Sequence, residues 1–207
     1  MNRLSSAVVA IFKGKLMIKT LTSVAAALLL AGTAHAAAVT VDALADSYNS
    51  GAGTGVAAGT LTLGESFSVT VASTDLWSAG ALPRWSNANG LTGNLYATGT
   101  DASGQPAGTL IGEDFGLFTT GDGSFHYGEL VGRIGTGNYF GIGTNFSGAA
   151  NASGVLELFY WDSYTPDNSG SVVANVNLVP EPGSVALMLA GLGIVGGIAR
   201  RRARNAG

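Results

Sequence analysis

Two kinds of residue are scarce in this sequence: cysteine is absent, and basic residues are almost confined to the two ends. Without cysteine the chain forms no disulfide, so a folded body must be stabilised by burial of its core or by a bound metal. Between residues 37 and 178 only Arg84 and Arg133 are basic, against twelve Asp and Glu, a formal charge of −10. Nucleic-acid binding needs clustered Lys and Arg, so we expect no nucleic-acid partner, whereas the acids suit a hard cation.

Catalytic side chains are scarce in the same segment. With one histidine, His126, and no cysteine, a Cys-His pair and a His-rich zinc site are excluded. A Ser-His-Asp triad would depend on His126, which lies in the strand-like stretch GSFHYGEL. Glu113 and Asp114 are adjacent, and adjacent residues on a strand point to opposite faces. We therefore expect that the protein is not an enzyme. The less favoured alternative is a hydrolase that uses two distant carboxylates, or His126 with a serine.

The first 36 residues are typical of a secretory signal peptide. Lys19 precedes the apolar run LTSVAAALLLAG, and AHA at 34–36 supplies the small residues that a signal peptidase recognises. We predict cleavage after Ala36, with the two following alanines as neighbouring alternatives. Met17 is an alternative start, and a first membrane helix that is never cleaved is the alternative interpretation of the whole segment.

The last 29 residues, 179–207, have three parts in a fixed order. Pro180-Glu181-Pro182 stops the preceding strand, since proline fixes φ and removes a backbone donor. Residues 183–199 are uncharged and mostly apolar, and as a helix they would span roughly 25 Å, near the lower limit for crossing a bilayer. An arginine cluster follows and favours a cytoplasmic end with the body outside. The cluster comprises Arg200, Arg201, Arg202 and Arg204.

This C-terminal segment resembles the PEP-CTERM sorting signal of Gram-negative bacteria. The resemblance implies insertion of residues 183–199 in the inner membrane, cleavage near the motif by an exosortase, and a link to exopolysaccharide production. Together with a signal peptidase at the other end, it implies an exported protein of the cell surface or extracellular matrix. The alternative is an ordinary tail anchor that is never cleaved.

Short apolar or alternating runs between glycine-rich turns fill residues 37–178, with no sustained helical period. In SFSVTV (66–71), Phe67, Val69 and Val71 are expected to face the core and the polar residues to face solvent. We interpret 51–60 as a loop. The pattern predicts an all-β domain over 37–178, an antiparallel β-sandwich or jelly roll. Residues 59–73 are expected to form a strand, a Gly-Glu turn and the alternating strand, and the other expected strands lie at 38–44, 93–99, 128–135, 138–146, 154–162 and 171–178.

The stretch LFYWDSYTPDNSG (158–170) carries the strongest candidate site. An apolar strand leads into Asp162, and Asp167 and Asn168 follow after a loop in which Tyr164 and Thr165 offer backbone carbonyls. Carboxylate, amide and carbonyl oxygens are the ligands that Ca²⁺ prefers. The alternative is a polar hairpin whose Asp and Asn only cap turns.

Residues 128–178 resemble the C-terminal half of the PA-IL type galactophilic lectins and related galactose-binding-like modules. The strands LVGRIG and ASGVLELFYWD and the turn DNSGSVVANV carry the resemblance, with a weaker match at 64–90. It implies that Asp162 and Asn168 bind both calcium and sugar, with Asp167 as a further calcium ligand. The loop is two residues shorter than in that family, Gly80 stands about where a tyrosine carbonyl is expected, and the galactose-contacting His-Pro and Gln have no counterpart.

Trp77 and Trp85 are the aromatic residues that we predict to stack on a sugar ring; packing in the core is the alternative for both. The sequence therefore predicts a non-enzymatic exported protein with a calcium loop that binds carbohydrate, such as the producer's exopolysaccharide. The second interpretation is a purely structural matrix β-sandwich without a sugar site.

Overall fold

The computed structural model describes residues 35–48, 53–179 and 182–205. The predicted signal peptide therefore lies almost wholly outside the described residues, as do Pro180 and Glu181 of the sorting motif. The β-rich body up to Val179 and the C-terminal helix are separate units, and each is described by itself.

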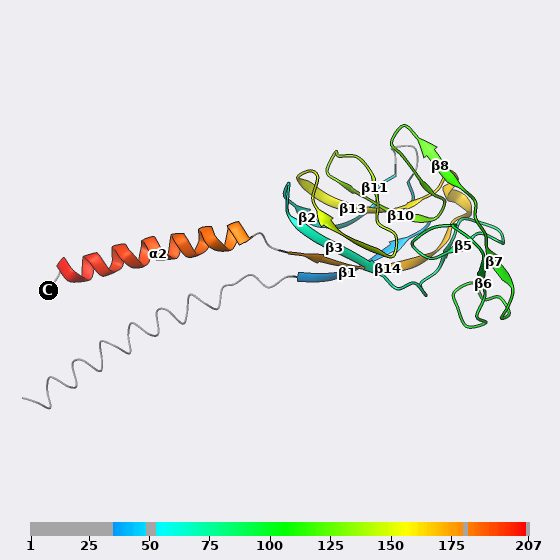
Figure 1. The fold of residues 1–207 in the computed structure, drawn as a ribbon, viewed down its shortest axis with the longest axis horizontal. Coiled ribbons are helices and arrows are strands. Elements are labelled where there is room, and N and C mark those ends of the chain that lie inside the picture. Colours follow the sequence, from blue (N-terminus) through cyan, green and yellow to red (C-terminus); the bar gives the residue numbers. More distant parts are fainter. Residues whose placement is uncertain (1–34, 49–52, 180–181, 206–207) are drawn as a thin grey trace, which may run out of the picture. The chain divides into compact units, whose positions relative to one another are not determined.

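The described part of the body consists of fourteen strands and one short 3-10 turn, so the predicted all-β class is confirmed (Figure 1). The 3-10 turn η1 covers Thr165–Asp167. The strands are β1 His35–Asp42, β2 Val56–Leu61, β3 Ser66–Val71, β4 Trp77–Ser78, β5 Trp85–Ser86, β6 Leu95–Tyr96, β7 Leu110–Gly112, β8 Leu117–Thr120, β9 Gly123–His126, β10 Glu129–Ile134, β11 Phe140–Gly141, β12 Asn145–Ala149, β13 Gly154–Trp161 and β14 Ser169–Leu178.

Two antiparallel sheets make up the sandwich. In the larger one β3 lies between β12 and β14, β1 pairs with β14, and the short β4 and β5 extend it from the start of β14. The smaller sheet has the order β11-β10-β13-β2. Two further pairs, β6 with β7 and β8 with β9, lie outside these sheets. The antiparallel sandwich predicted from the sequence is therefore present.

The main core lies between the two sheets and follows the expected alternation. In β3 the side chains of Phe67, Val69 and Val71 are buried, and the residues between them are more exposed, as predicted. The opposite wall comes from the smaller sheet. Its fully buried residues in this core are Leu61, Leu130, Ile134, Leu156, Leu158 and Tyr160.

Strand β13 is buried on both faces. Leu158 and Tyr160 point into the main core, whereas Phe159 and Trp161 belong to a second cluster on the outer face of the smaller sheet. The β8–β9 hairpin covers this cluster, and the Trp161 Nε1–H donates to the Phe118 carbonyl at 2.9 Å. Burial on both faces explains why GVLELFYW is nearly continuously apolar instead of alternating.

Four sequence predictions about elements need correction. The strand expected at 38–44 ends at Asp42, because the Asp42 carboxylate accepts hydrogen bonds from the amides of Leu44 and Ala45 and starts a turn. The loop expected at 51–60 already contains β2 from Val56 onward. Only Leu95–Tyr96 of 93–99 is a strand, and the single strand expected at 138–146 is instead two strands, β11 and β12, in different sheets. The β8–β9 hairpin was not expected.

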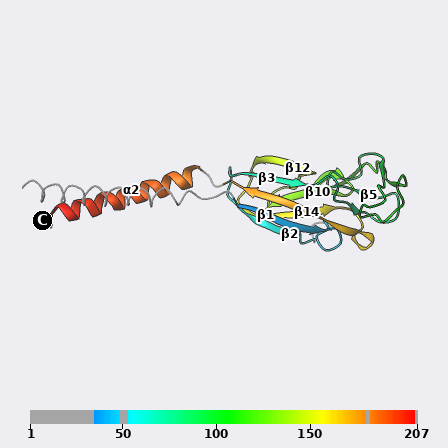
Figure 2. The same cartoon turned by 90° about the horizontal axis from the view of Figure 1, so that it is seen from below.

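The register of β1 against β14 places the two ends of the body side by side (Figure 2). His35 faces Leu178, and Ala37 faces Val176. Cleavage after Ala36 would leave six β1 residues, Ala37–Asp42, to pair. Because β14 contains ten residues, its first residue lies roughly 30 Å from these ends. The loop that precedes β14 is therefore at the opposite end of the sandwich.

The helix predicted over 183–199 is present as part of α2, Pro182–Asn205, and Arg200, Arg201 and Arg202 lie near its C-terminal end. Of the helices described here, none has both the length and the apolar character needed to cross a membrane. The predicted membrane crossing is thus not confirmed.

Substitutions on both faces of β13 should destabilise the body. We expect Leu158→Ala and Phe159→Ala each to lower the free energy of unfolding by about 2–5 kcal/mol, since both side chains are fully buried. Val155→Ala, at a 41% exposed position of the same strand, is the matched control and should change it by less than about 0.5 kcal/mol. Chemical denaturation would measure all three; a negligible effect of Phe159→Ala would contradict the second buried face.

Candidate functional site

The candidate site is the loop between β13 and β14. Asp162 directly follows Trp161, the last residue of β13, and is only 4% exposed. Pro166 stiffens the single turn η1, after which Asn168 is again buried, at 5% exposure. The loop thus returns two polar side chains to the protein interior and leaves Tyr164 and Asp167 exposed.

Burial makes the charged form of Asp162 unfavourable. Removal from water raises the pKa of this carboxyl from 3.8 to about 6, and the negative charge of Asp167 adds to the effect. The Ser163 amide donates to Asp162 Oδ1 at 2.7 Å and opposes the rise of the pKa only in part. A nearby cation would remove this penalty because it favours the carboxylate.

Asn168 presents an unpaired oxygen in the same interior. Its Nδ2 donates to the Ala43 carbonyl and to Ser47 Oγ, both at 3.2 Å, which orients the amide. Its Oδ1 is buried and has no hydrogen-bond partner among the described residues. Buried acceptors without partners are uncommon and costly, so this oxygen is suited to a ligand such as a cation or an ordered water.

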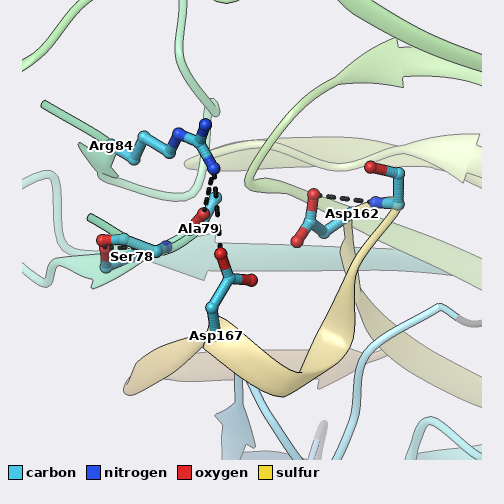
Figure 3. A network of polar contacts seen from close by, with 7 residues as sticks. Ser78, Ala79, Arg84, Asp162 and Asp167 are labelled. Atoms are coloured by element: carbon cyan, nitrogen blue, oxygen red, sulfur yellow. Dashed lines mark hydrogen bonds and ion pairs between the residues drawn. The ribbon is translucent and has the colours of Figure 1, made fainter. Parts of the chain in front are cut away.

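Asp167 faces the turn between β4 and β5 (Figure 3). Its Oδ2 lies 3.8 Å from Arg84 Nη1, and the same nitrogen donates to the Ala79 carbonyl at 3.4 Å. Gly80 has a φ of +116°, and a Cβ at this position would collide with Asp167 Oδ2. Glycine is therefore required here both for its backbone conformation and for the close approach of the carboxylate.

A small pocket of about 250 Å³ opens beside these residues. Asp162, Asp167, Arg84, Phe115 and Tyr127 are among the residues that line it. Its volume is below that of ordinary small-molecule sites, about 300–1,000 Å³, so it suits an ion with one sugar-sized group rather than a large ligand. The remaining lining residues are Ala79, Leu91, Ser163 and Tyr164.

The described residues contain no group of three or more His, Asp or Glu arranged to hold a metal. A cation at this loop would rely on two carboxylates, the Asn168 amide oxygen and backbone carbonyls, which is a donor set for Ca²⁺ and not for zinc. The Thr165 carbonyl already accepts from the backbone N–H of Asn168 at 3.1 Å, and the Gly80 carbonyl accepts from Ser78 Oγ at 2.8 Å. The buried, unpaired Asn168 Oδ1 is the observation that fits a cation best.

One predicted sugar contact is wrong. Trp77 is completely buried, its Nε1–H donates to the Gly128 carbonyl at 2.9 Å, and its ring packs edge-on against Tyr160. No face of this indole remains for a sugar. Trp85 is half-buried and packs against Leu76 and Ile111, so at most part of its ring is accessible.

Arg84, Phe115 and Tyr127 line the pocket but were not predicted as site residues. They come from sequence segments that are far from the loop, and no local pattern connects them to it. The one signal available was the isolation of Arg84 in an acidic segment.

Comparisons with known proteins agree with two features of the chain. Residues 178–203 match the PEP-CTERM protein-sorting motif, which confirms the predicted signal. The N-terminal domain of EclA, described as a PllA-like lectin, is similar in structure, with 19% identity and a TM-score of 0.42 over 69% of this chain and 95% of that domain. This similarity is too distant to assign a function or a site residue. No curated protein matches the sequence.

Replacement of the buried carboxylate should stabilise the protein in the absence of metal. Because the pKa of Asp162 is higher in the folded state, the folded state binds more protons between about pH 4 and 6, and stability falls as pH rises through that range. Asp162→Asn removes this cost, so its free energy of unfolding at pH 7 in EDTA should exceed that of the wild type by up to about 3 kcal/mol.

Denaturation at pH 4, 5, 6 and 7 would measure this difference. Asp114→Asn, in an exposed turn, is the control and should follow the wild-type profile. A variant Asp162→Asn that is less stable than the wild type at pH 7 would show that the carboxylate is satisfied without a cation.

Proposed function

We propose that this is an exported, non-enzymatic protein that holds Ca²⁺ in the β13–β14 loop and uses the ion to bind carbohydrate. The single observation that supports it most is the unpaired buried oxygen of Asn168, in the same loop as the buried carboxylate of Asp162. The PEP-CTERM motif is that of exported proteins processed by an exosortase.

Calcium binding accounts for the electrostatics of the loop. Asp162, Asp167 and Asn168 would hold the ion, with backbone carbonyls of Tyr164 and Thr165 as further donors. Ca²⁺ offers open coordination positions to neighbouring hydroxyls of a sugar. With calcium bound, the carboxylates would stay ionised. The exposed ring of Tyr164 and the partly exposed ring of Trp85 are the aromatic surfaces that we propose to stack on the sugar.

The candidate loop and the sorting motif are at opposite ends of β14. The sorting motif follows the end of β14, and β1 begins beside that end, whereas the candidate site lies before the start of β14. In our proposal, residues 183–199 and the arginines Arg200, Arg201 and Arg202 hold the chain transiently at the inner membrane of a Gram-negative bacterium. The site would then bind exopolysaccharide at the cell surface or in the matrix.

Two alternatives remain distinct from this proposal. A structural matrix protein would use calcium only to fasten the loop, with no coordination position open to sugar. A hydrolase would use other groups: burial raises the pKa of Glu129, and its Oε2 accepts from the backbone amide of His126 at 3.0 Å. That hydrogen bond comes from the main chain and not from the imidazole, so it does not form a catalytic dyad.

Calcium should raise the melting temperature of the purified protein. At 100 times its Kd, calcium would stabilise the fold by about 2.7 kcal/mol, a shift of several degrees. The shift should be larger at pH 7.5 than at pH 5, because protons compete with calcium for Asp162. Thermal denaturation with calcium and with EDTA measures it.

The variants decide where the ion binds. Asp162→Asn should abolish the calcium shift, and Asp114→Asn should keep it. The absence of a shift in the wild type, or its survival in Asp162→Asn, would remove calcium from the loop and favour the structural alternative.

Processing at both ends can be read from the mass of the mature protein. In a host with an exosortase, we expect the mature chain to begin at Ala37 and to end near Pro180–Pro182. Alanine at both prolines of the motif should leave the tail attached. A mature protein that retains α2 despite the intact motif would favour an uncleaved tail anchor.

A further inference from the structure

Arg84 and Arg133, the two basic residues between residues 37 and 178, have very different surroundings. The Arg133 guanidinium donates to Glu157 Oε2 at 2.7 and 3.2 Å and to Tyr139 Oη at 2.9 Å, and it lies over the rings of Tyr139 and Phe159. Its charge is therefore fully compensated. Arg133 is a structural residue that packs against the second cluster, on the outer face of the smaller sheet.

Arg84 is held but not neutralised in this way. Its nearest carboxylate oxygen, on Asp167, is 3.8 Å away, beyond hydrogen-bond distance. Among the described residues its guanidinium makes one hydrogen bond, to the Ala79 carbonyl, which is long at 3.4 Å, and the side chain is 39% exposed. The guanidinium lies 4.8 Å from the centre of the Phe115 ring, which positions it at the pocket.

The pocket thus combines a fixed cation with the candidate calcium loop. Figure 3 shows Arg84 reaching toward Asp167 and Ala79, with Asp162 across from it. If calcium takes Asp167 as a ligand, Arg84 loses the one carboxylate that lies within 4.0 Å of it in the described part of the chain, and its N–H donors become available to a second anion. A neutral sugar would leave this half-buried charge uncompensated.

We propose that Arg84 recognises the carboxylate of an acidic sugar, a uronic acid, whose hydroxyls bind the calcium in the same pocket. This inference rests on the proposed function. A guanidinium presents paired donors that match a carboxylate, and such charged hydrogen bonds are about twice as strong as neutral ones. The body has a formal charge of −10 between residues 37 and 178 and repels a polyanion at long range, so an acidic glycan needs local positive groups.

The test compares a uronic acid with its own neutral ester. Methyl glycosides of galacturonic and glucuronic acid, and the methyl esters of both, would be titrated calorimetrically into the purified full-length protein at saturating calcium. We expect one acid to bind roughly 10- to 100-fold more tightly than its ester, the range for a charge-assisted hydrogen-bonded pair. This preference should decrease as salt is added.

Variants of Arg84 separate recognition from folding. In Arg84→Gln the acid and its ester should bind within about twofold of each other, and Arg84→Lys should restore part of the preference because it keeps the charge but not the paired donors. Both variants should keep the calcium-induced rise in melting temperature, which shows that the loop is intact.

The outcomes distinguish the two proposals. Absence of calcium stabilisation in the wild type would overturn the proposed function itself. Calcium stabilisation together with equal binding of acid and ester, or with no binding of either uronide, would overturn only the role of Arg84. A preference for the acid that survives in Arg84→Gln would assign the carboxylate to another group and would also overturn it.

Discussion

The burial of β13 on both faces is the constraint on which the rest of the structure depends. One face of the strand, with Leu158 and Tyr160, closes the core against the larger sheet, and the other, with Phe159 and Trp161, is covered by the β8–β9 hairpin. A strand packed on two sides has little freedom at its end. Asp162 therefore enters the interior as the continuation of a rigid element, and the desolvation of its carboxylate follows from that position.

The acidic residues of the body differ in how well their surroundings compensate their charge. Several acids accept backbone amides at exposed turns or strand ends, as Asp42 and Asp114 do. Asp162 and Asn168 instead hold a poorly compensated carboxylate and an unpaired oxygen inside the protein. Such unfavourable groups persist at sites where function requires them. Arg84, the loosely paired cation, lines the same pocket as Asp162.

Strand β14 connects the candidate site to the end of the body at which both predicted cleavage positions lie. Its first residues follow the loop, its whole length pairs with β1 or β4, and its last residue precedes the sorting motif. The strand therefore separates the site from both processing positions by the length of the sandwich. Cleavage near either end would not disturb the residues around Asp162, since the intervening register has eight residue pairs with β1, of which six remain after cleavage at Ala36.

The sequence alone determined what depends on local pattern. Alternation in SFSVTV predicted which side chains of β3 are buried, the ordered motif, helix and arginines predicted the sorting signal, and the acids after FYW indicated the site. These features are set by residues close together in the chain. Tertiary structure alone decided that Trp77 is buried and not a sugar platform, that a hairpin covers the outer face of the smaller sheet, and that Arg84 and Phe115 meet the loop. Each of these depends on packing between strands that are distant in sequence. The free energy of that packing comes from the apolar area it buries, and the local hydrophobic periodicity of the sequence does not reveal it.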